Sequence, residues 1–272
     1  MKISTFPAYY TTLDKLGWYG LRVLCSAVLL FLLLPIIVII PLSFSDSSFL
    51  SYPITGWSLR WYQELFASSD WGRATRNSFI VAPLATLIAT ALGTLAAVGL
   101  ARSQFIGKGL LTSLLIAPMV VPIVVVGVST YLFFARIGLS DSYTALVLVH
   151  AALGAPFVLT TVMATLQGFN QNLVKASLSL GAGPLQTFFR ITLPVIAPGV
   201  ISGALFAFAT SFDEVVVTLF LAGPTQTTLP RQMFTGIREN ISPTIAAVAT
   251  LLILFTACLM MTLEWLRGRV KK

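Results

Sequence analysis

The sequence predicts an all-α membrane protein with six transmembrane helices. The first observation is composition: 57% of the 272 residues are hydrophobic and only 10% are charged, whereas a soluble domain carries about 25% charged residues. The second is the presence of long stretches without charge, because about 20 apolar residues are enough to cross a bilayer. A chain with so little charge cannot cover a water-facing surface, which excludes a soluble globular enzyme and a disordered protein.

Six apolar stretches each predict one transmembrane helix. They are residues 23–43, 78–101, 111–134, 144–166, 196–221 and 243–265. The fifth contains two adjacent acids, Asp213 and Glu214. The uncharged run 23–45 is longer than the apolar part of a secretory signal, and no A-x-A cleavage site follows it, which favours a retained helix. We expect three regions: a cytoplasmic or interfacial segment (1–22), a transmembrane domain (23–265) and a basic cytoplasmic tail (266–272).

Basic residues predict the orientation of these helices. An even number of spans places both termini on the same side of the membrane, and an excess of Lys and Arg marks the cytoplasmic side. With cytoplasmic termini, 11 of the 17 Lys and Arg residues fall in inside segments, and the tail sequence RGRVKK decides the bias. The net charge of +8 therefore follows from membrane topology and does not indicate a nucleic-acid partner.

Two predicted spans carry small residues at every fourth position, which lets helices approach closely in lipid. These residues are Ala85, Ala89, Gly93, Ala97 and Ala101 in the second span, and Gly199 and Gly203 in the fifth. Such ladders pack helices within one chain or between subunits, and the sequence leaves both open. Several spans also contain proline, which bends helices. Bent helices suit a transporter cavity better than a simple anchor.

The loop 167–194, between the fourth and fifth spans, is the most informative segment. It reads QGFNQNLVKASLSLGAGPLQTFFRITLP. Asn170 is a helix-capping residue type, Gly181 suits the left-handed position after a helix, and Pro184 suits the first turn of a second helix. The loop is too apolar to lie free in water, so we expect it to dock on the rest of the chain or on a partner protein.

Within this loop, K-A-S-x-x-x-G-A followed by I-x-L-P resembles the E-A-A-x-x-x-G…I-x-L-P loop of ABC importer permeases. The matching residues are Lys175, Ala176, Ser177, Gly181, Ala182, Ile191, Leu193 and Pro194. A second stretch, 211–253, is similar to the C-terminal region of spermidine/putrescine permease subunits of the C type. Two positions depart from the family pattern: Lys175 replaces its Glu, and Ser177 replaces its second Ala.

The resemblance implies the type I ABC importer permease fold in the bacterial cytoplasmic (inner) membrane. The chain would form half of a translocation pathway that works by alternating access. Implied partners are a second homologous permease subunit, a dimer of a cytoplasmic ABC ATPase, a periplasmic or extracellular solute-binding protein and the lipid bilayer. In the family this loop is the coupling helix that inserts into the ATPase. The chain lacks a Walker motif, so we expect it to be no enzyme and to bind no metal or cofactor. The partner ATPase would use ATP and Mg.

The two acids of the fifth span are the candidate substrate residues. An ionisable residue within a span is a functional-site hypothesis by default. Phe208 and Phe212 lie close in sequence, and aromatic faces attract ammonium groups. A small cationic solute, with a polyamine such as spermidine or putrescine as first choice, would use both residue types in this pathway. An interfacial ion pair is the alternative role of Asp213 and Glu214.

Other functions stay open. Permeases of the same family carry ferric iron, aminophosphonates, opines or 4-aminobutyrate. A secondary transporter is a more distant alternative. Such carriers usually contain internal repeats and polar midplane sites, whereas this sequence has no evident repeat and few charges within its spans. The only histidine, His150, is expected to make a hydrogen bond in helix packing.

Overall fold

The computed structural model describes residues 10–239 and 242–270, except for the side chains of residues 260 and 262–270. Within these ranges the chain is helical, and one isolated β-bridge joins Ser45 to Trp57. The chain forms two compact units. The smaller unit comprises residues 1–68 and 236–272, and the larger unit comprises residues 69–235. The all-α prediction is confirmed.

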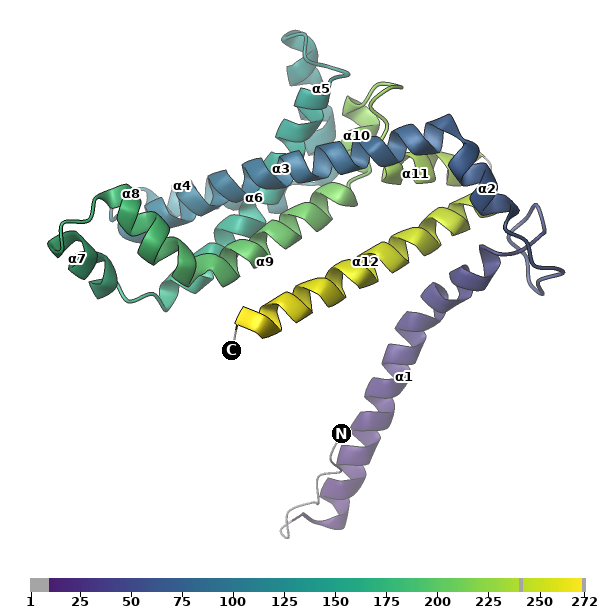
Figure 1. Ribbon diagram of the computed structural model, residues 1–272, viewed down its shortest axis with the longest axis horizontal. Coiled ribbons are helices and arrows are strands. Elements are labelled where there is room, and N and C mark those ends of the chain that lie inside the picture. Colours follow the sequence, from purple (N-terminus) through teal and green to yellow (C-terminus); the bar gives the residue numbers. More distant parts are fainter. Residues whose placement is uncertain (1–9, 240–241, 271–272) are drawn as a thin grey trace. The chain divides into compact units, whose positions relative to one another are not determined.

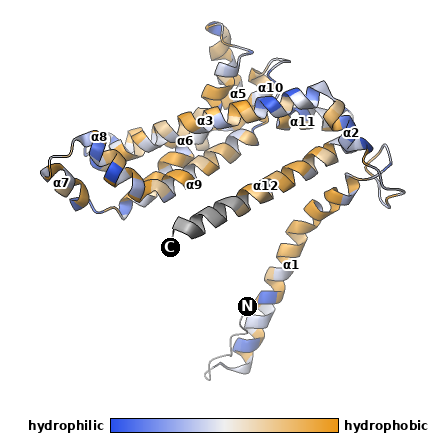
Figure 2. Ribbon diagram, in the orientation of Figure 1, coloured by the Kyte–Doolittle hydropathy of each residue, from blue (hydrophilic) through white to orange (hydrophobic). Residues whose placement is uncertain are grey.

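Three long helices build the larger unit: α3 (Ser69–Arg102), α6 (Tyr143–Gln167) and α9 (Leu193–Phe212). They lie side by side in Figure 1 and pack against one another. Their apolar stripes meet in one core, where Leu146, Leu159 and Ile196 are fully buried. Figure 2 shows that hydrophobic residues run along these helices, while polar residues gather at helix ends and connections.

The small-residue ladders pack helices within the chain. A methyl carbon placed on Gly93 of α3 would lie 2.7 Å from Cβ of Val158 on α6. One placed on Gly203 of α9 would lie 2.6 Å from Cα of the same valine. These distances are far below van der Waals contact, so α6 approaches α3 and α9 as closely as glycine allows. Of the two alternatives, intrachain packing is the one observed at these positions.

The predicted third span, 111–134, is not one straight helix. It consists of α4 (Lys108–Ile116), the 3₁₀ turn η1 (Ala117–Met119) and α5 (Ile123–Arg136), with a bend of 97°. Pro118 lies in the 3₁₀ turn, and Pro122 precedes α5 in a non-helical conformation (φ −54°, ψ 126°). Proline lacks an N–H and disfavours helical geometry in the residue before it, so two prolines four residues apart break the helix here.

The predicted fifth span, 196–221, is also wrong at both ends. Helix α9 ends at Phe212, and a separate short helix, α10 (Val216–Leu221), follows. At the other end, α8 (Pro184–Thr187) and the π-helix η2 (Phe188–Thr192) continue directly into α9. The apolar helix therefore runs from Pro184 to Phe212, so the coupling loop and the span share one helix. Asp213 and Glu214 lie in the break.

The smaller unit contains α1 (Thr12–Leu42), α2 (Arg60–Ala67) and α12 (Pro243–Val270), while α11 (Leu229–Glu239) crosses the boundary between the units. Helix α12 packs against α1 and α2. Helix α1 begins well before the predicted span 23–43, so part of the segment 1–22 belongs to it. Likewise, residues 266–270 continue α12 beyond the predicted span 243–265, and 271–272 lie outside the described residues.

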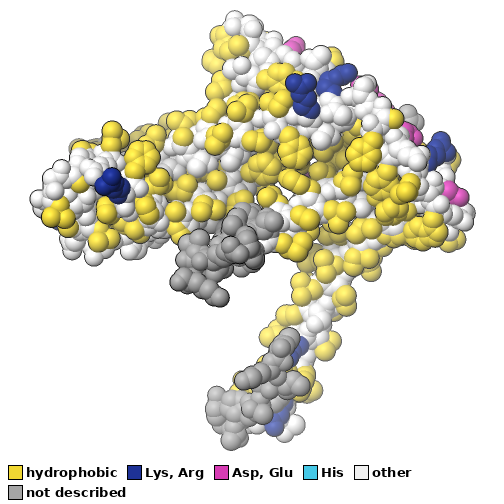
Figure 3. All heavy atoms as spheres, in the orientation of Figure 1, with side chains coloured by type: hydrophobic (Ala, Val, Ile, Leu, Met, Phe, Trp, Pro, Cys, Tyr) yellow, Lys and Arg dark blue, Asp and Glu magenta, His cyan; other side chains and the backbone are white. Residues whose placement is uncertain are grey.

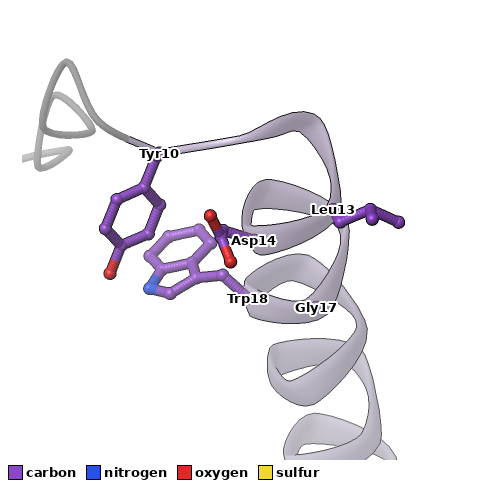
Figure 4. A pocket seen from close by; sticks show the side chains of 5 residues that line it. All are labelled: Tyr10, Leu13, Asp14, Gly17 and Trp18. Atoms are coloured by element: carbon purple, nitrogen blue, oxygen red, sulfur yellow. The ribbon is translucent and has the colours of Figure 1, made fainter.

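A capping box fixes the start of α1. The Thr11 hydroxyl accepts a hydrogen bond from the Asp14 backbone N–H (3.3 Å), and the Asp14 carboxylate accepts one from the Thr11 backbone N–H (2.8 Å). This reciprocal pair satisfies two N–H groups at the helix start. Figure 4 shows Tyr10, Asp14 and Trp18 together on one side of this turn, beside a shallow hollow, with Leu13 pointing away.

Four of the described helical stretches are long and apolar enough to cross a membrane: α1, α3, α6 and residues 184–212. The bent α4–α5 pair makes a fifth if it counts as one span. Helix α12 contributes a shorter apolar stretch, Pro243–Leu259. Figure 3 shows hydrophobic side chains on much of the visible surface of the helices, with charged side chains in only a few places. Such an exterior is suited to lipid.

Candidate functional site

The predicted coupling loop forms a helix, a turn and a second helix, as its sequence indicates. Helix α7 spans Asn172–Ser179, and Oδ1 of Asn170 accepts a hydrogen bond from the Asn172 backbone N–H at 3.0 Å. Gly181 follows α7 with φ of +84°, a conformation that side chains resist. Pro184 is the first residue of α8. The local predictions for Gly181 and Pro184 are confirmed. The prediction for Asn170 is wrong by one position: Gln171 is the N-cap residue of α7, without a capping hydrogen bond from its side chain, and Asn170 lies just before it.

The turn between α7 and α8 borders an open groove of about 480 Å³. It is lined by Leu173, Ala176, Ser177, Leu180, Gly181, Ala182, Gln186, Arg190 and Ile191. Five of the eight predicted coupling residues therefore meet in one groove. The other three do not line it: Lys175 is exposed on α7, and Leu193 and Pro194 begin α9.

Large apolar side chains lie exposed around this groove. Leu180 is 88% exposed and Leu185 is 75% exposed, while no residue of α7 is fully buried. On the inner side, Val174 and Phe188 pack against the core of the larger unit. Water makes such an uncovered apolar patch unfavourable. The segment thus packs on its own bundle with one side and leaves the other, apolar side exposed.

The candidate substrate residues lie at the end of α9. The rings of Phe208 and Phe212 are stacked, with centroids 5.4 Å apart and planes at 24°. Phe79 of α3 meets the ring of Phe212 edge-on, also at 5.4 Å. Asp213 follows immediately and is exposed. An exposed carboxylate next to an aromatic cluster can bind an ammonium group through charge and through ring faces.

Glu214 has a different role from its neighbour. Its Oε1 atom accepts a hydrogen bond of 2.8 Å from the Val217 backbone N–H, and Val217 lies in the first turn of α10. A carboxylate at a helix N-terminus satisfies an otherwise free N–H group. Of the two predicted acids, Asp213 is thus the one whose carboxylate is exposed, and Glu214 stabilises the start of α10.

His150 bridges the same break from α6. It is buried, with Nδ1 2.8 Å from the Ser211 hydroxyl and Nε2 3.3 Å from the Thr218 hydroxyl. Ser211 lies on α9 and Thr218 on α10. The expected packing hydrogen bond is therefore confirmed, and it connects three helices.

Sequence reasoning missed a second polar anchor, Asn77. Its side-chain amide donates hydrogen bonds to the carbonyl oxygens of Thr225 (2.9 Å) and Thr227 (2.8 Å), and accepts one from the Tyr143 hydroxyl (2.8 Å). A buried amide needs such partners. These bonds hold the segment after α10 against α3 and α6. The signal was an asparagine at the very start of an apolar run, although its partners lie 66, 148 and 150 positions away.

The sequence matches, over residues 89–272, the family described as "Binding-protein-dependent transport system inner membrane component". It is 35% identical to the putrescine transport system permease protein PotI of Escherichia coli over 230 residues, 82% of each chain. It is 33% identical to the spermidine/putrescine transport system permease protein PotC of Haemophilus influenzae, covering 84% of this chain and 89% of that protein.

Solved structures give the same fold. A bacterial ABC transporter involved in the import of the acidic polysaccharide alginate matches with a TM-score of 0.74, at 14% identity, over 96% of this chain and 99% of the other. A second match, at a TM-score of 0.68 and 20% identity, covers 92% of each chain and is the alginate ABC transporter in complex with a periplasmic protein. The resemblance predicted from the coupling motif is confirmed: the chain belongs to the family of binding-protein-dependent transport system inner membrane components, the permeases of ABC importers.

Proposed function

We propose that this chain forms half of the translocation pathway of an ATP-driven polyamine importer. The observation that carries the proposal is the exposed carboxylate of Asp213 directly after the stacked rings of Phe208 and Phe212. A diammonium chain offers two positive ends and an alkyl middle, which match a carboxylate and aromatic faces. The names of the relatives, putrescine and spermidine/putrescine permeases, point to the same class of solute.

The groove between α7 and η2 is proposed to receive a cytoplasmic ABC ATPase, which hydrolyses ATP with Mg. Exposed Leu180 and Leu185 beside the groove support this, because a protein surface that covers them would remove their apolar area from water. ATP binding would close the ATPase dimer and pull on this segment. The pull would turn an inward-open pathway outward.

The arrangement in the membrane is proposed to be six crossings with both termini in the cytoplasm. The bent α4–α5 pair and α12 would each supply one crossing besides the four long apolar helices. The excess of basic residues in the inside segments supports this orientation. A second permease subunit would complete the pathway, and a solute-binding protein would deliver the polyamine from the outer face.

Uptake of radiolabelled putrescine into proteoliposomes that contain the whole transporter tests the proposal. Asp213→Asn should lower the maximal uptake rate about tenfold or more, because a charge-assisted contact is worth about 1.5–3 kcal/mol. The half-saturating concentration should change little, since the binding protein captures the solute. Asp70→Asn is the matched control, because Asp70 is an exposed acid paired with Arg73 at the start of α3.

Competition identifies the solute class in the same assay. Excess unlabelled spermidine should suppress putrescine uptake, whereas ferric iron or 4-aminobutyrate should leave it unchanged. Uptake without ATP, or no putrescine uptake at all by the wild-type complex, contradicts the proposed function. Equal uptake by Asp213→Asn and Asp70→Asn contradicts the role given to Asp213.

A further inference from the structure

The helix that leads from the coupling groove into the membrane contains a π-helical segment. Residues Phe188–Thr192 (η2) are wound as a π-helix between α8 and α9. Such segments are rare and occur frequently at functional sites. A threonine lies at each end: Thr187 directly before the segment, 2% exposed, and Thr192 as its last residue, fully buried. A buried hydroxyl needs a hydrogen-bond partner, and each threonine has one on a different helix.

The first partner lies on α7. The Ser177 hydroxyl is 3.0 Å from the Thr187 hydroxyl. Ser177 also lines the groove, at the centre of the coupling motif. Helix α7 has no fully buried residue, so few contacts oppose its movement when a partner pulls on it. This hydrogen bond therefore connects a superficial helix to the buried start of the π-segment.

The second partner lies on α3. Arg102, the last residue of α3, donates a hydrogen bond from Nη2 to the Thr192 hydroxyl at 3.0 Å. Hydrogen bonds from a charged donor are stronger than those between neutral groups. Helix α3 supplies a large part of the core, with Val81, Ala85 and Ala89 buried. A displacement of the π-segment would thus move α3 through the Arg102 hydrogen bond. It would also move α9, because the backbone of the π-segment continues into that helix.

We infer that Arg102 and Thr192 are positioning residues that transmit movement of α7 to α3. The Ser177–Thr187 hydrogen bond would first transmit the movement of α7 to the π-segment. This inference rests on the proposed function, because it takes the groove beside α7 as the ATPase contact. The geometry behind it is independent of substrate: a π-segment tied at one end to the groove helix and at the other end to the core helix. Without the Arg102 bond, α9 would move with less accompanying movement of α3.

The test uses the complete transporter, with the ATPase, both permease subunits and the binding protein, and radiolabelled putrescine as the transported probe. Thr192→Val removes the acceptor and keeps the shape of the side chain. We expect it to lower the number of putrescine molecules transported per ATP hydrolysed roughly fivefold or more. Fivefold is the lower end of the range by which one site commonly affects another in a coupled protein. Arg102→Gln should have the same effect. The double variant should be no worse than either single variant, because both remove one interaction.

Two further variants separate coupling from folding. Thr192→Ser keeps the hydroxyl and should restore the ratio. Thr86→Val is the matched control, because the Thr86 hydroxyl on α3 donates only within its own helix, to the carbonyl oxygen of Ala82. All variants should co-purify with the ATPase as wild type does, and Thr192→Val, Thr192→Ser and Thr86→Val should melt close to the wild-type temperature. Arg102→Gln should melt lower, because it leaves the buried Thr192 hydroxyl without its partner, so its transport ratio is measured on the folded complex. A purely structural role of Thr192 would instead lower the melting temperature and leave the transport ratio of the surviving complex unchanged.

The outcomes distinguish this inference from the proposed function. If the wild-type chain does not co-purify with an ATPase, both are overturned. If the wild-type complex couples normally and Thr192→Val and Arg102→Gln keep the wild-type ratio, only this inference is overturned. Additive losses in the double variant also overturn it, because they would show that the two side chains act separately.

Discussion

His150 and Ser211 are joined by a hydrogen bond of 2.8 Å between Nδ1 and Oγ, and both side chains are buried. The other ring nitrogen of His150 lies 3.3 Å from the Thr218 hydroxyl. One imidazole on α6 therefore contacts the helix on each side of the break that carries Asp213. The position of the exposed carboxylate depends on how these helices meet, so His150 fixes the geometry of the candidate substrate site.

Replacing His150 by leucine should destabilise the larger unit. The Ser211 hydroxyl would lose its imidazole partner in a buried site, which costs about 1–3 kcal/mol in the free energy of unfolding. Thr218 should suffer less, because its hydroxyl also donates to the Glu214 carbonyl oxygen at 3.1 Å. Thermal melting of the purified protein in detergent measures the effect. His150→Gln retains polar atoms and should melt closer to wild type; identical melting of His150→Leu and wild type would contradict this role.

Two glycines of the coupling turn provide a matched pair. Gly181 has φ of +84°, whereas Gly183 has an ordinary extended conformation with φ of −70°. A Cβ atom at either position would meet no atom within 4 Å, so any difference between them comes from the backbone and not from crowding. A left-handed conformation costs a side chain about 1–2 kcal/mol, and more for a β-branched residue.

We therefore expect Gly181→Val to abolish ATP-dependent uptake while membrane insertion stays intact, since the turn between α7 and α8 would change shape. Gly183→Val should transport normally. Gly181→Asn should be intermediate, because asparagine tolerates this conformation better than valine. Uptake by each variant, normalised to the amount of protein in the membrane, is the measurement. Normal uptake by Gly181→Val would remove the support for the coupling assignment.

The coupling turn was predictable because its determinants are local. Gly181 and Pro184 act through backbone conformation, and each has the conformation that its residue type favours. The hydrogen bond that the Asn170 side chain accepts likewise comes from a residue only two positions away. Such signals lie entirely within a few residues, so one sequence is sufficient to read them.

The helix breaks were not predictable in the same way. Hydropathy measures composition over a window and is insensitive to where a helix bends. A single proline does not predict a break either, because Pro83, Pro156 and Pro198 all lie inside continuous helices, whereas the pair Pro118 and Pro122 accompanies a 97° bend. The break between α9 and α10 contains no proline at all, and the hydrogen bonds across it come from His150, a side chain far away in sequence.

The close approach of α3 and α6 predicts a second contrast between two glycines of one helix. A methyl group on Gly93 would lie 2.7 Å from Cβ of Val158 and 2.8 Å from the Ala155 carbonyl oxygen, while one on Gly99 would meet nothing within 4 Å. Gly93→Ala should therefore push the helices apart and destabilise the fold by about 1–3 kcal/mol.

Gly99→Ala should be neutral or slightly stabilising, since alanine favours a helix more than glycine does. Thermal melting of both variants in detergent provides the comparison. A melting temperature of Gly93→Ala at or above that of Gly99→Ala would show that the two helices can separate without cost, against the packing described here.

The charge of Lys175 gives an expectation about the surface of the ATPase. It is exposed on α7 at the position where the family motif has an acidic residue, and Arg190 lines the adjacent groove. The surface of the cognate ATPase should therefore present negative charge at this point. Lys175→Glu would place like charges opposite each other, and we expect it to weaken association with the ATPase about tenfold at low ionic strength, a change of about 1.4 kcal/mol.

Raising the salt concentration should reveal the origin of that loss. At 1 M salt the Debye length falls to about 3 Å, so the difference between Lys175→Glu and wild type should shrink. Lys175→Gln should lie between the two, because it removes the charge without reversing it. Arg136→Glu is the matched control, since it makes the same charge change at the end of α5, away from the groove, and should bind the ATPase as wild type does. Tighter binding by Lys175→Glu would contradict this expectation. It would mean that the ATPase surface opposite Lys175 is basic and repels this lysine in the wild-type complex.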